Sequence, residues 1–387
     1  MDLIPKPDQV ASAASNVASK VLHGGVADLR PMPRTLIDEG PLRFVFRYDR
    51  AEGVDVFGDP VLLVMPLAAP SSCYDLRRTC SLVEHFVNAG RPTYLVEYGE
   101  VAFKDRALGF EHWIDEVLPS AIDAVHRDTG RRPVHLVAWS LGGIFSVLTL
   151  AAHQDLPVAS LTTMGSPWDI AKVPLLAPIR PLLNANLPEP LRVITKGYQV
   201  LGGAPSTLVR WGFQLSAVDK LVTKPLVTVQ HLDDTDYLAQ LEAVSAFGRD
   251  MMAYPGRTFG QLYHRVIRNN ELRTGRLELG ERTIDVRDVK VPVMVMGGET
   301  DGIAPLGAVR PIVAMLKGAP AVRWEAVPGG HLGMVTGRAA RTKTWPLIDA
   351  WLDQWASAGT SRMGIGANPR RRHSSAGSRA LTSKLKS

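Results

Sequence analysis

The chain has 387 residues, of which 45% are hydrophobic and 21% are charged, a composition that excludes a disordered or fibrous protein. Its net charge of +6 raises the question of nucleic-acid binding, but residues 358–387 alone carry seven Lys and Arg side chains and no Asp or Glu. The remaining chain is therefore close to neutral, and we expect no nucleic-acid partner. We interpret the basic tail 358–387 as a disordered end, with docking on an acidic surface as the alternative.

Cys73 and Cys80 are the only cysteines, and they lie seven residues apart at one expected helix start. Two helical turns would separate their Cα atoms by about 10 Å, too far for a disulfide. Free thiols favour a reducing compartment. There is no signal-peptide pattern and no run of about 18 apolar residues, so we expect a cytoplasmic protein that is not transmembrane.

Residues 1–40 are expected to form an N-terminal extension with an amphipathic helix over residues 8–22. The apolar face of this helix would consist of Val10, Ala14, Val17 and Val21. It would pack against the body or, alternatively, on a lipid surface.

From residue 41 the pattern alternates between strands and helices. The expected strands are 42–48, 61–65, 93–97, 134–138 and 160–164, and the expected helices are 75–89, 110–126 and one that runs from residue 140 to Ala151. This repetition predicts a mainly parallel sheet with helices on both faces, and residues 41–166 would be its first part.

The alternation stops over residues 167–285, which contain many prolines and no strong buried strand. We interpret this segment as an inserted, mainly helical cap. Its apolar run 173–178 would line an acyl pocket and move as a lid, or would be structural filler. The pattern resumes with strands 291–296 and 322–327 and helices 308–316 and 342–356, so residues 286–357 would be the second part of the core.

The turn after strand 134–138 reads Ala138-Trp139-Ser140-Leu141-Gly142. In a nucleophile elbow, a serine sits in a strained strand-to-helix turn, and small residues two positions away on either side prevent clashes. Ala138 would replace the usual first glycine at the cost of one methyl group. An ordinary serine at the start of a helix is the alternative interpretation of the motif alone.

The same turn predicts an oxyanion hole. The N–H of Leu141 at the start of the helix would be one donor, and the second would come from Leu67 or Ala68 in the loop after strand 61–65.

An acid and a histidine follow the last two strands. Asp301 comes after strand 291–296 and would be the acid that orients the catalytic imidazole. Glu299 is a competing candidate for this acid, and Asp301 could instead cap the helix that follows. His331 follows strand 322–327 between glycines. Since α/β-hydrolases carry their catalytic triad in the order Ser, Asp, His, we predict that Ser140, Asp301 and His331 form one. No metal-ligand, phosphate-loop or dinucleotide motif is present, so we expect no metal and no cofactor.

Several further motifs make the chain from about residue 60 to 355 resemble the polyhydroxyalkanoate synthase family. They are Tyr74-Asp75-Leu76-Arg77, Ser81-Leu82-Val83, Tyr254-Pro255-Gly256, Gln261-Leu262-Tyr263, Asn269-Asn270-Glu271-Leu272, Asp301-Gly302-Ile303-Ala304-Pro305 and Gly330-His331. The resemblance implies an α/β-hydrolase fold and assigns the family's triad to Ser140, Asp301 and His331.

Two features depart from that family. The family's nucleophile is a cysteine, whereas this chain has Ser140. The residue after the family's aspartate is usually histidine and the loop closes with Pro-Trp, whereas this chain has Gly302 and Pro305-Leu306. A serine forms a more stable oxyester, which suits ester hydrolysis or transfer between oxygens.

We therefore expect a serine-dependent hydrolase of hydrophobic acyl or hydroxyacyl esters or polyesters, similar to lipases, esterases and polyester depolymerases. The first alternative is an acyltransferase or synthase that uses a hydroxyacyl-coenzyme A thioester as its substrate. The second alternative is a non-catalytic protein associated with lipid droplets or polyester granules. The enzyme of the leading hypothesis could likewise lie peripherally on the surface of such granules in the cytoplasm.

Overall fold

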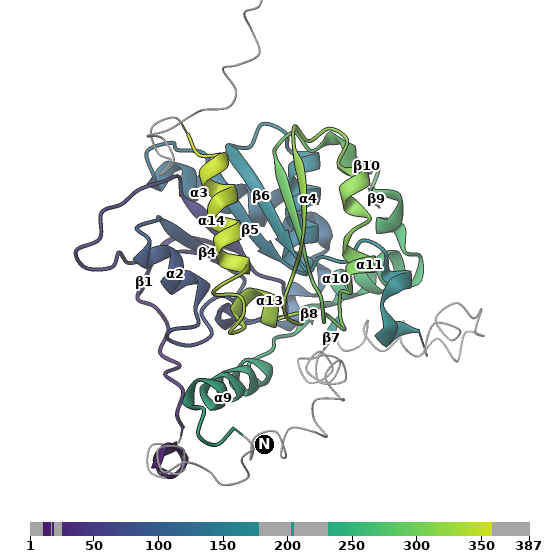
Figure 1. Ribbon diagram of the computed structural model, residues 1–387. Helices are drawn as coiled ribbons and strands as arrows, with labels where there is room; N and C mark the ends of the chain where they lie inside the picture. The colour runs from purple at the N-terminus through teal and green to yellow at the C-terminus, as the bar shows by residue number, and fades with distance from the viewer. Residues whose placement is uncertain (1–10, 17, 19–24, 178–202, 205–230, 358–387) are drawn as a thin grey trace, which may run out of the picture.

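The computed structural model describes residues 11–16, 18, 25–177, 203–204 and 231–357. Helices cover both faces of an eight-stranded sheet whose strands lie in the order β1-β2-β4-β3-β5-β6-β11-β12 (Figure 1). The strands are β1 Arg34–Gly40, β2 Arg43–Tyr48, β3 Val61–Val64, β4 Thr93–Glu97, β5 Val134–Trp139, β6 Val158–Met164, β11 Val293–Gly298 and β12 Val322–Val327. β1, β2 and β4 pair antiparallel, and all pairings from β4 to β12 are parallel, which confirms the predicted fold class.

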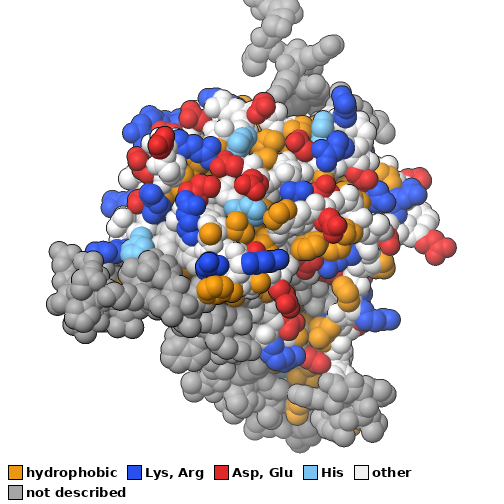
Figure 2. Space-filling model, turned by 180° about the vertical axis from the view of Figure 1, so that it is seen from behind, with side chains coloured by type: hydrophobic (Ala, Val, Ile, Leu, Met, Phe, Trp, Pro, Cys, Tyr) orange, Lys and Arg blue, Asp and Glu red, His pale blue; other side chains and the backbone are white. Residues whose placement is uncertain are grey.

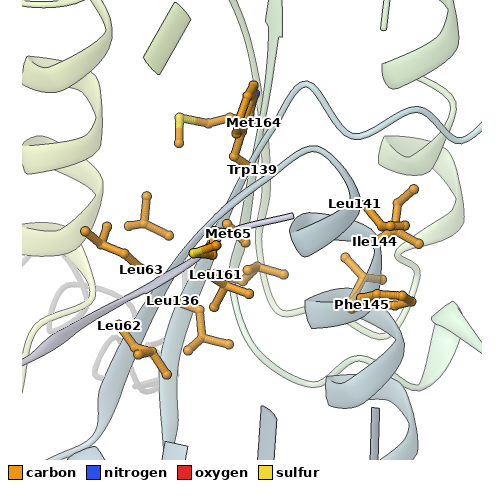
Figure 3. Close-up of a cluster of buried hydrophobic side chains, with 14 of the residues drawn as sticks. Leu62, Leu63, Met65, Leu136, Trp139, Leu141, Ile144, Phe145, Leu161 and Met164 are labelled. Atoms are coloured by element: carbon orange, nitrogen blue, oxygen red, sulfur yellow. The ribbon is translucent and has the colours of Figure 1, made fainter. Parts of the chain in front are cut away.

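The core lies between the sheet and two helical layers. β3 and β5 are buried along their whole length, as their continuous apolar runs predict. Figure 3 shows side chains of these strands and of β6 beside those of α4, Leu141–Ala152. α4 and the π-helical turn His112–Val117, which continues into α3, Leu118–Asp128, lie on one face, where Thr149 Oγ1 donates to Ile114 O at 3.2 Å.

The other face carries α2, Leu82–Asn88, and α14, Thr344–Gln354, joined by His85 Nε2 and Asp349 Oδ2 at 2.8 Å. α2 begins seven residues later than the predicted helix 75–89, because Thr79 has a φ of +66° and the Ser81 side chain caps the helix by accepting the Glu84 N–H. Cys73 therefore ends a separate 3₁₀ turn, Ser71–Cys73, and both cysteines are free and buried.

The N-terminal region differs from its prediction in two ways. β1 lies inside the expected extension 1–40, yet it is the edge strand of the main sheet; a bulge between Leu36 and Asp38 breaks the alternation that would have revealed it. Within the predicted helix 8–22, residues 11–16 and 18 are helical, with Ala14 exposed and Asn16 buried. Val10, Val17 and Val21 lie outside the described residues.

The segment 167–285 contains more β-structure than expected. Its elements are the 3₁₀ turns Ile170–Lys172 and Pro174–Leu176, β7 Gly203–Ala204, α9 Thr235–Arg249, β8 Tyr254–Pro255, α10 Gly256–Gln261, the π-helical turn Leu262–Arg268, the 3₁₀ turn Glu271–Thr274, β9 Arg276–Leu279 and β10 Arg282–Asp285. β9 and β10 form a hairpin with Leu277, Leu279 and Ile284 buried, which corrects the expectation of no buried strand. The cap and its lid motion stay predictions, and residue 178 of the apolar run lies outside the described part.

The last part of the core carries a 3₁₀ turn, Val286–Asp288, and four helices. The predicted helix 308–316 is two short helices, α11 Leu306–Val309 and α12 Ile312–Met315, because Pro311 interrupts it. α13, Gly333–Thr336, precedes α14. A 3₁₀ turn, Phe103–Ala107, follows β4. No helix among the described residues is long and apolar enough to cross a membrane. Positive and negative side chains are interspersed over the face in Figure 2.

Candidate active site

Ser140 occupies a strained turn between β5 and α4. Its backbone angles are φ +53° and ψ −122°, a combination that non-glycine residues rarely adopt. The Ser140 N–H donates to Met164 O of β6 at 2.8 Å, so the main sheet holds the turn. Ala138 is fully buried, and its methyl group is accommodated in β5.

Gly142 allows α4 to start directly against the end of β3. A Cβ atom at this position would lie 2.6 Å from Val64 O and 2.7 Å from Met65 O, and backbone atoms cannot move aside as flexible side chains do. The requirement for a small residue therefore comes from the contact between α4 and β3.

The carboxyl ends of three strands bring Ser140, His331 and Asp301 together. His331 Nε2 is 2.9 Å from Ser140 Oγ, and His331 Nδ1 is 2.8 Å from Asp301 Oδ2. The second carboxylate oxygen, Oδ1, accepts the N–H groups of Ile303 and Ala304, both at 2.8 Å. Asp301, and not its competitor Glu299, is thus the acid that contacts the imidazole.

Asp301 is charged despite its burial. Burial acts to raise its pKa, but the electrostatic attraction of the His331 imidazole, the hydrogen bond from its Nδ1 and the two backbone N–H groups outweigh it, so the pKa of Asp301 lies below its ordinary value. An ionised carboxylate only accepts hydrogen bonds, so the proton lies on His331 Nδ1. His331 Nε2 then accepts from the Ser140 hydroxyl, the arrangement needed for proton removal from a nucleophile.

Two further side chains hold this geometry. Trp139, which the sequence marked only as part of the elbow, donates its indole N–H to His331 O at 3.0 Å, and its ring lies 4.9 Å from the imidazole. Ser166 was not identified from the sequence; its hydroxyl donates to Ser140 O at 2.7 Å. Its position just past the buried strand β6, next to β5, is the signal that could have revealed it.

The predicted oxyanion donors belong to two segments, the start of α4 and the turn after β3. Leu141 opens α4, so its N–H has no carbonyl four residues back within the helix. Leu67 and Ala68 lie in a buried turn after β3, closed by the Ala69 N–H donating to Pro66 O at 3.2 Å. The close contact of Gly142 with β3 brings this turn beside the start of α4. Their role as donors stays a prediction.

No group of three or more His, Cys, Asp or Glu side chains in the described part of the chain could hold a metal ion. A cavity of about 540 Å³ lies elsewhere, lined among others by Arg47, Pro92 and Arg132. Since Pro92 precedes β4 and Arg132 precedes β5, this cavity is at the amino ends of the strands, opposite Ser140.

Several known proteins are similar to this chain in sequence or in fold. The chain matches the model of the alpha/beta hydrolase fold over residues 104–337. It is 27% identical over 361 residues to a poly(3-hydroxyalkanoate) polymerase subunit PhaC from Allochromatium vinosum, covering 90% of this chain and 98% of the relative. A subunit of the same name from Thiocystis violacea is 26% identical over 360 residues, with the same two coverages. A solved monoacylglycerol lipase from Paleococcus ferrophilus is 16% identical, with a TM-score of 0.46 over 80% of this chain and 98% of that one. The polymerase relatives confirm the resemblance to the polyhydroxyalkanoate synthases, and the chain belongs to the α/β-hydrolase fold family.

Proposed function

We propose that this enzyme transfers hydroxyacyl groups through an acyl intermediate on Ser140 and builds ester bonds from hydroxyacyl thioesters. The observation that carries the proposal is the chain of contacts from Ser140 through His331 to Asp301, at 2.9 and 2.8 Å. Relatives named poly(3-hydroxyalkanoate) polymerase subunits, matched over 98% of their length, favour this transfer reaction over simple hydrolysis.

In the first half-reaction, Ser140 Oγ attacks the thioester carbonyl and His331 Nε2 removes its proton. The Leu141 N–H and the turn at Leu67 and Ala68 would stabilise the oxyanion. When the C–S bond breaks, His331 returns the proton to the leaving thiol. In the second half-reaction, His331 deprotonates the hydroxyl of another hydroxyacyl group, whose oxygen attacks the carbonyl of the acyl-Ser140 ester. When the bond from that carbonyl to Ser140 Oγ breaks, His331 returns the proton to the serine.

This mechanism requires no metal and no cofactor beyond the thioester substrate. A polyester of hydrophobic units leaves water as it grows, so the enzyme would work at the surface of its own product.

A second candidate is hydrolysis of hydrophobic esters or polyesters, and the serine at position 140 favours it. The oxyester on Ser140 stores less energy than a thioester would, so its transfer to another hydroxyl has little driving force, whereas its hydrolysis by water stays favourable. The two functions share the first half-reaction and differ only in whether a hydroxyl or water resolves the acyl-enzyme.

The test supplies the purified enzyme with p-nitrophenyl esters of graded chain length and, separately, with a hydroxyacyl-coenzyme A thioester. Transfer predicts thiol release accompanied by an oligomeric ester, with little free hydroxy acid. Hydrolysis predicts nitrophenol release without any thioester, and free acid as the main product from both substrates.

Ser140→Ala, Asp301→Asn and His331→Ala should each lower turnover of either substrate by orders of magnitude, while the folded fraction stays the same. Because the three residues act as a unit, double variants should be hardly worse than single ones. Near-normal turnover by Ser140→Ala would show that the reaction, if any, occurs elsewhere.

A further inference from the structure

The short helix α13 fixes the position of His331. It begins at Gly333, two residues after the histidine, and ends at Thr336, so any shift of α13 moves the imidazole relative to Ser140. The last carbonyls of a helix have no donors within the helix and need other partners. Side chains from other elements supply them here: Trp345 Nε1 donates to Val335 O at 2.7 Å, and Cys80 Sγ donates to Thr336 O at 2.9 Å.

Gln240 of α9 is the third of these donors. Its side-chain Nε2 donates to Thr336 O at 3.0 Å, across 96 residues of sequence. Its Oε1 accepts from Arg77 Nε, also at 3.0 Å. An arginine only donates hydrogen bonds, so Arg77 fixes which end of the amide faces it and leaves the NH₂ group for Thr336.

Arg77 is itself held in place. It is only 4% exposed, and its Nη2 lies 2.6 Å from Asp236 Oδ1, one turn before Gln240 on α9. Asp236 also accepts from Arg341 at 2.9 Å. Burial acts to raise the pKa of Asp236, but the hydrogen bonds and charges of Arg77 and Arg341 outweigh it, so the carboxyl stays ionised.

The far end of α9 reaches the other side of the same site. The Phe247 ring lies 6.2 Å from that of Trp139, whose indole N–H binds His331 O. Beyond the helix, the Met252 N–H donates to Ala68 O, in the predicted oxyanion turn, at 2.8 Å. In Figure 1, α9 lies below α13, beyond this end of the sheet. α9 and the segment that follows it therefore contact the end of α13, Trp139 of the elbow and the predicted oxyanion turn.

We propose that Gln240 is a positioning residue for His331, acting through the Thr336 carbonyl, and that Arg77 orients its amide. The inference rests on the proposed function, because it assigns His331 as the base. A displacement of about 1 Å between reacting groups lowers rates about a hundredfold, so a small shift of α13 is enough to matter.

The decisive variant is Gln240→Glu. A carboxylate keeps the size of the side chain and its contact with Arg77 but cannot donate to Thr336 O. We expect kcat for p-nitrophenyl esters and the rate of Ser140 labelling by an alkyl fluorophosphonate to fall about tenfold or more. KM should stay within about twofold, and the thermal midpoint should change little, since the ion pair gained with Arg77 offsets the repulsion of the new carboxylate from Thr336 O and Asp236.

The matched control is Arg338→Gln. Arg338 Nη1 pairs with Asp234 Oδ2 at 2.8 Å, so it also ties α9 to the segment after α13, but at a 40% exposed position and without contact with Gln240 or Thr336. It also lies 3.7 Å from Asp236 Oδ2, but Arg77 and Arg341 hold that carboxylate more closely, at 2.6 and 2.9 Å. We expect near-normal labelling from this variant. Equal losses in both variants, or a change in KM alone, would mean that α9 is only a structural support.

The outcomes separate the inference from the function. Wild-type protein that is not labelled by the fluorophosphonate overturns the proposed function and the inference with it. A labelled wild type with an equally reactive Q240E variant overturns the inference alone. Should Q240E fail to fold, Cys80→Ala, which removes another donor to Thr336 O, must lower kcat in the same way by a smaller factor; an unchanged kcat in that variant would refute the positioning role.

Discussion

Ser140 is held in its rare backbone conformation through both of its peptide groups. Its N–H donates to Met164 O at 2.8 Å, and its C=O accepts from Ser166 Oγ at 2.7 Å. Backbone strain of this kind costs about 1–3 kcal/mol and persists only when the surroundings enforce it. The strained conformation exposes the Ser140 hydroxyl above the sheet, so the free energy spent on the strain places the nucleophile where it can react.

Replacing the nucleophile by a thiol tests which step limits the reaction. In Ser140→Cys the thiol would lie at the start of α4 beside His331, where a helix N-terminus and a nearby base lower the pKa of a thiol. Exchange from a thioester is then nearly isoenergetic, so we expect faster acylation by hydroxyacyl thioesters and slower ester hydrolysis. Intact-protein mass spectrometry should show an acyl adduct on the variant.

The wild-type enzyme provides the comparison for Ser140→Cys. Its oxyester should turn over before an adduct accumulates under the same conditions. An equal adduct on both proteins, or none on the variant with full ester hydrolysis retained, would contradict the expected difference between thiol and hydroxyl.

At the scale of elements, the contact between α4 and β3 sets the geometry of the predicted oxyanion hole. Gly142→Ala would place a methyl group within 2.7 Å of Val64 O and Met65 O. Since neither carbonyl can rotate away, α4 must shift. We expect a loss of about 1–3 kcal/mol in the free energy of unfolding and much slower fluorophosphonate labelling.

Gly248 in α9 offers the matched control for Gly142→Ala, because a Cβ there has nothing within 4 Å. Gly248→Ala should leave labelling unchanged and leave stability unchanged or raise it by up to about 1 kcal/mol, from helix propensity. Urea unfolding measures both. If Gly142→Ala shows the same labelling rate and the same free energy of unfolding as Gly248→Ala, the close contact between α4 and β3 does not set the geometry of the site.

Elements that have a local sequence pattern could be predicted, whereas elements whose bounds depend on contacts with distant residues could not. The buried strands β3 and β5 follow from continuous apolar runs, and the order of Ser140, Asp301 and His331 predicts their meeting at one edge of a parallel sheet. The start of α2 did not follow from periodicity, because buried contacts of Arg77 with α9, some 160 residues away, hold the chain before it in an irregular path.

At the scale of the whole molecule, the strand order explains why side chains so distant in sequence share one site. β5, β11 and β12 are parallel, so their carboxyl ends lie at the same end of the sheet and the loops after them meet there. β1 is the outermost strand on the other side of the sheet and contributes no residue to the site. The sequence could locate the site but not the supports around it. Ser166, Gln240 and Met252 donate hydrogen bonds to the site and its supports across 26, 96 and 184 residues, and no local pattern marks such pairs.

The opposite end of the sheet contains a group that should limit stability in acid. His135 of β5 is fully buried, and its Nδ1 lies 2.8 Å from Ser160 Oγ, while its Nε2 is buried without a hydrogen-bond partner among the described residues. Burial, assisted by the charge of Arg91 and partly offset by Asp59, lowers the pKa of His135 to about 3. The folded protein therefore keeps this imidazole neutral well below the pH at which an unfolded chain protonates it.

The sign of the effect follows from proton binding. Between an unfolded pKa of about 6.5 and the folded pKa of about 3, the unfolded chain binds the extra proton, so the free energy of unfolding falls as the pH falls, by about 1.4 kcal/mol per unit from this group. In His135→Asn this contribution is absent. We expect urea unfolding at pH 7, 6, 5 and 4 to give a wild-type stability that falls steadily relative to the variant. Ser160→Ala, which perturbs the same buried site but keeps the imidazole, should retain the wild-type dependence of the free energy of unfolding on pH. Parallel pH curves for the wild type and His135→Asn would show that His135 does not control the loss of stability in acid.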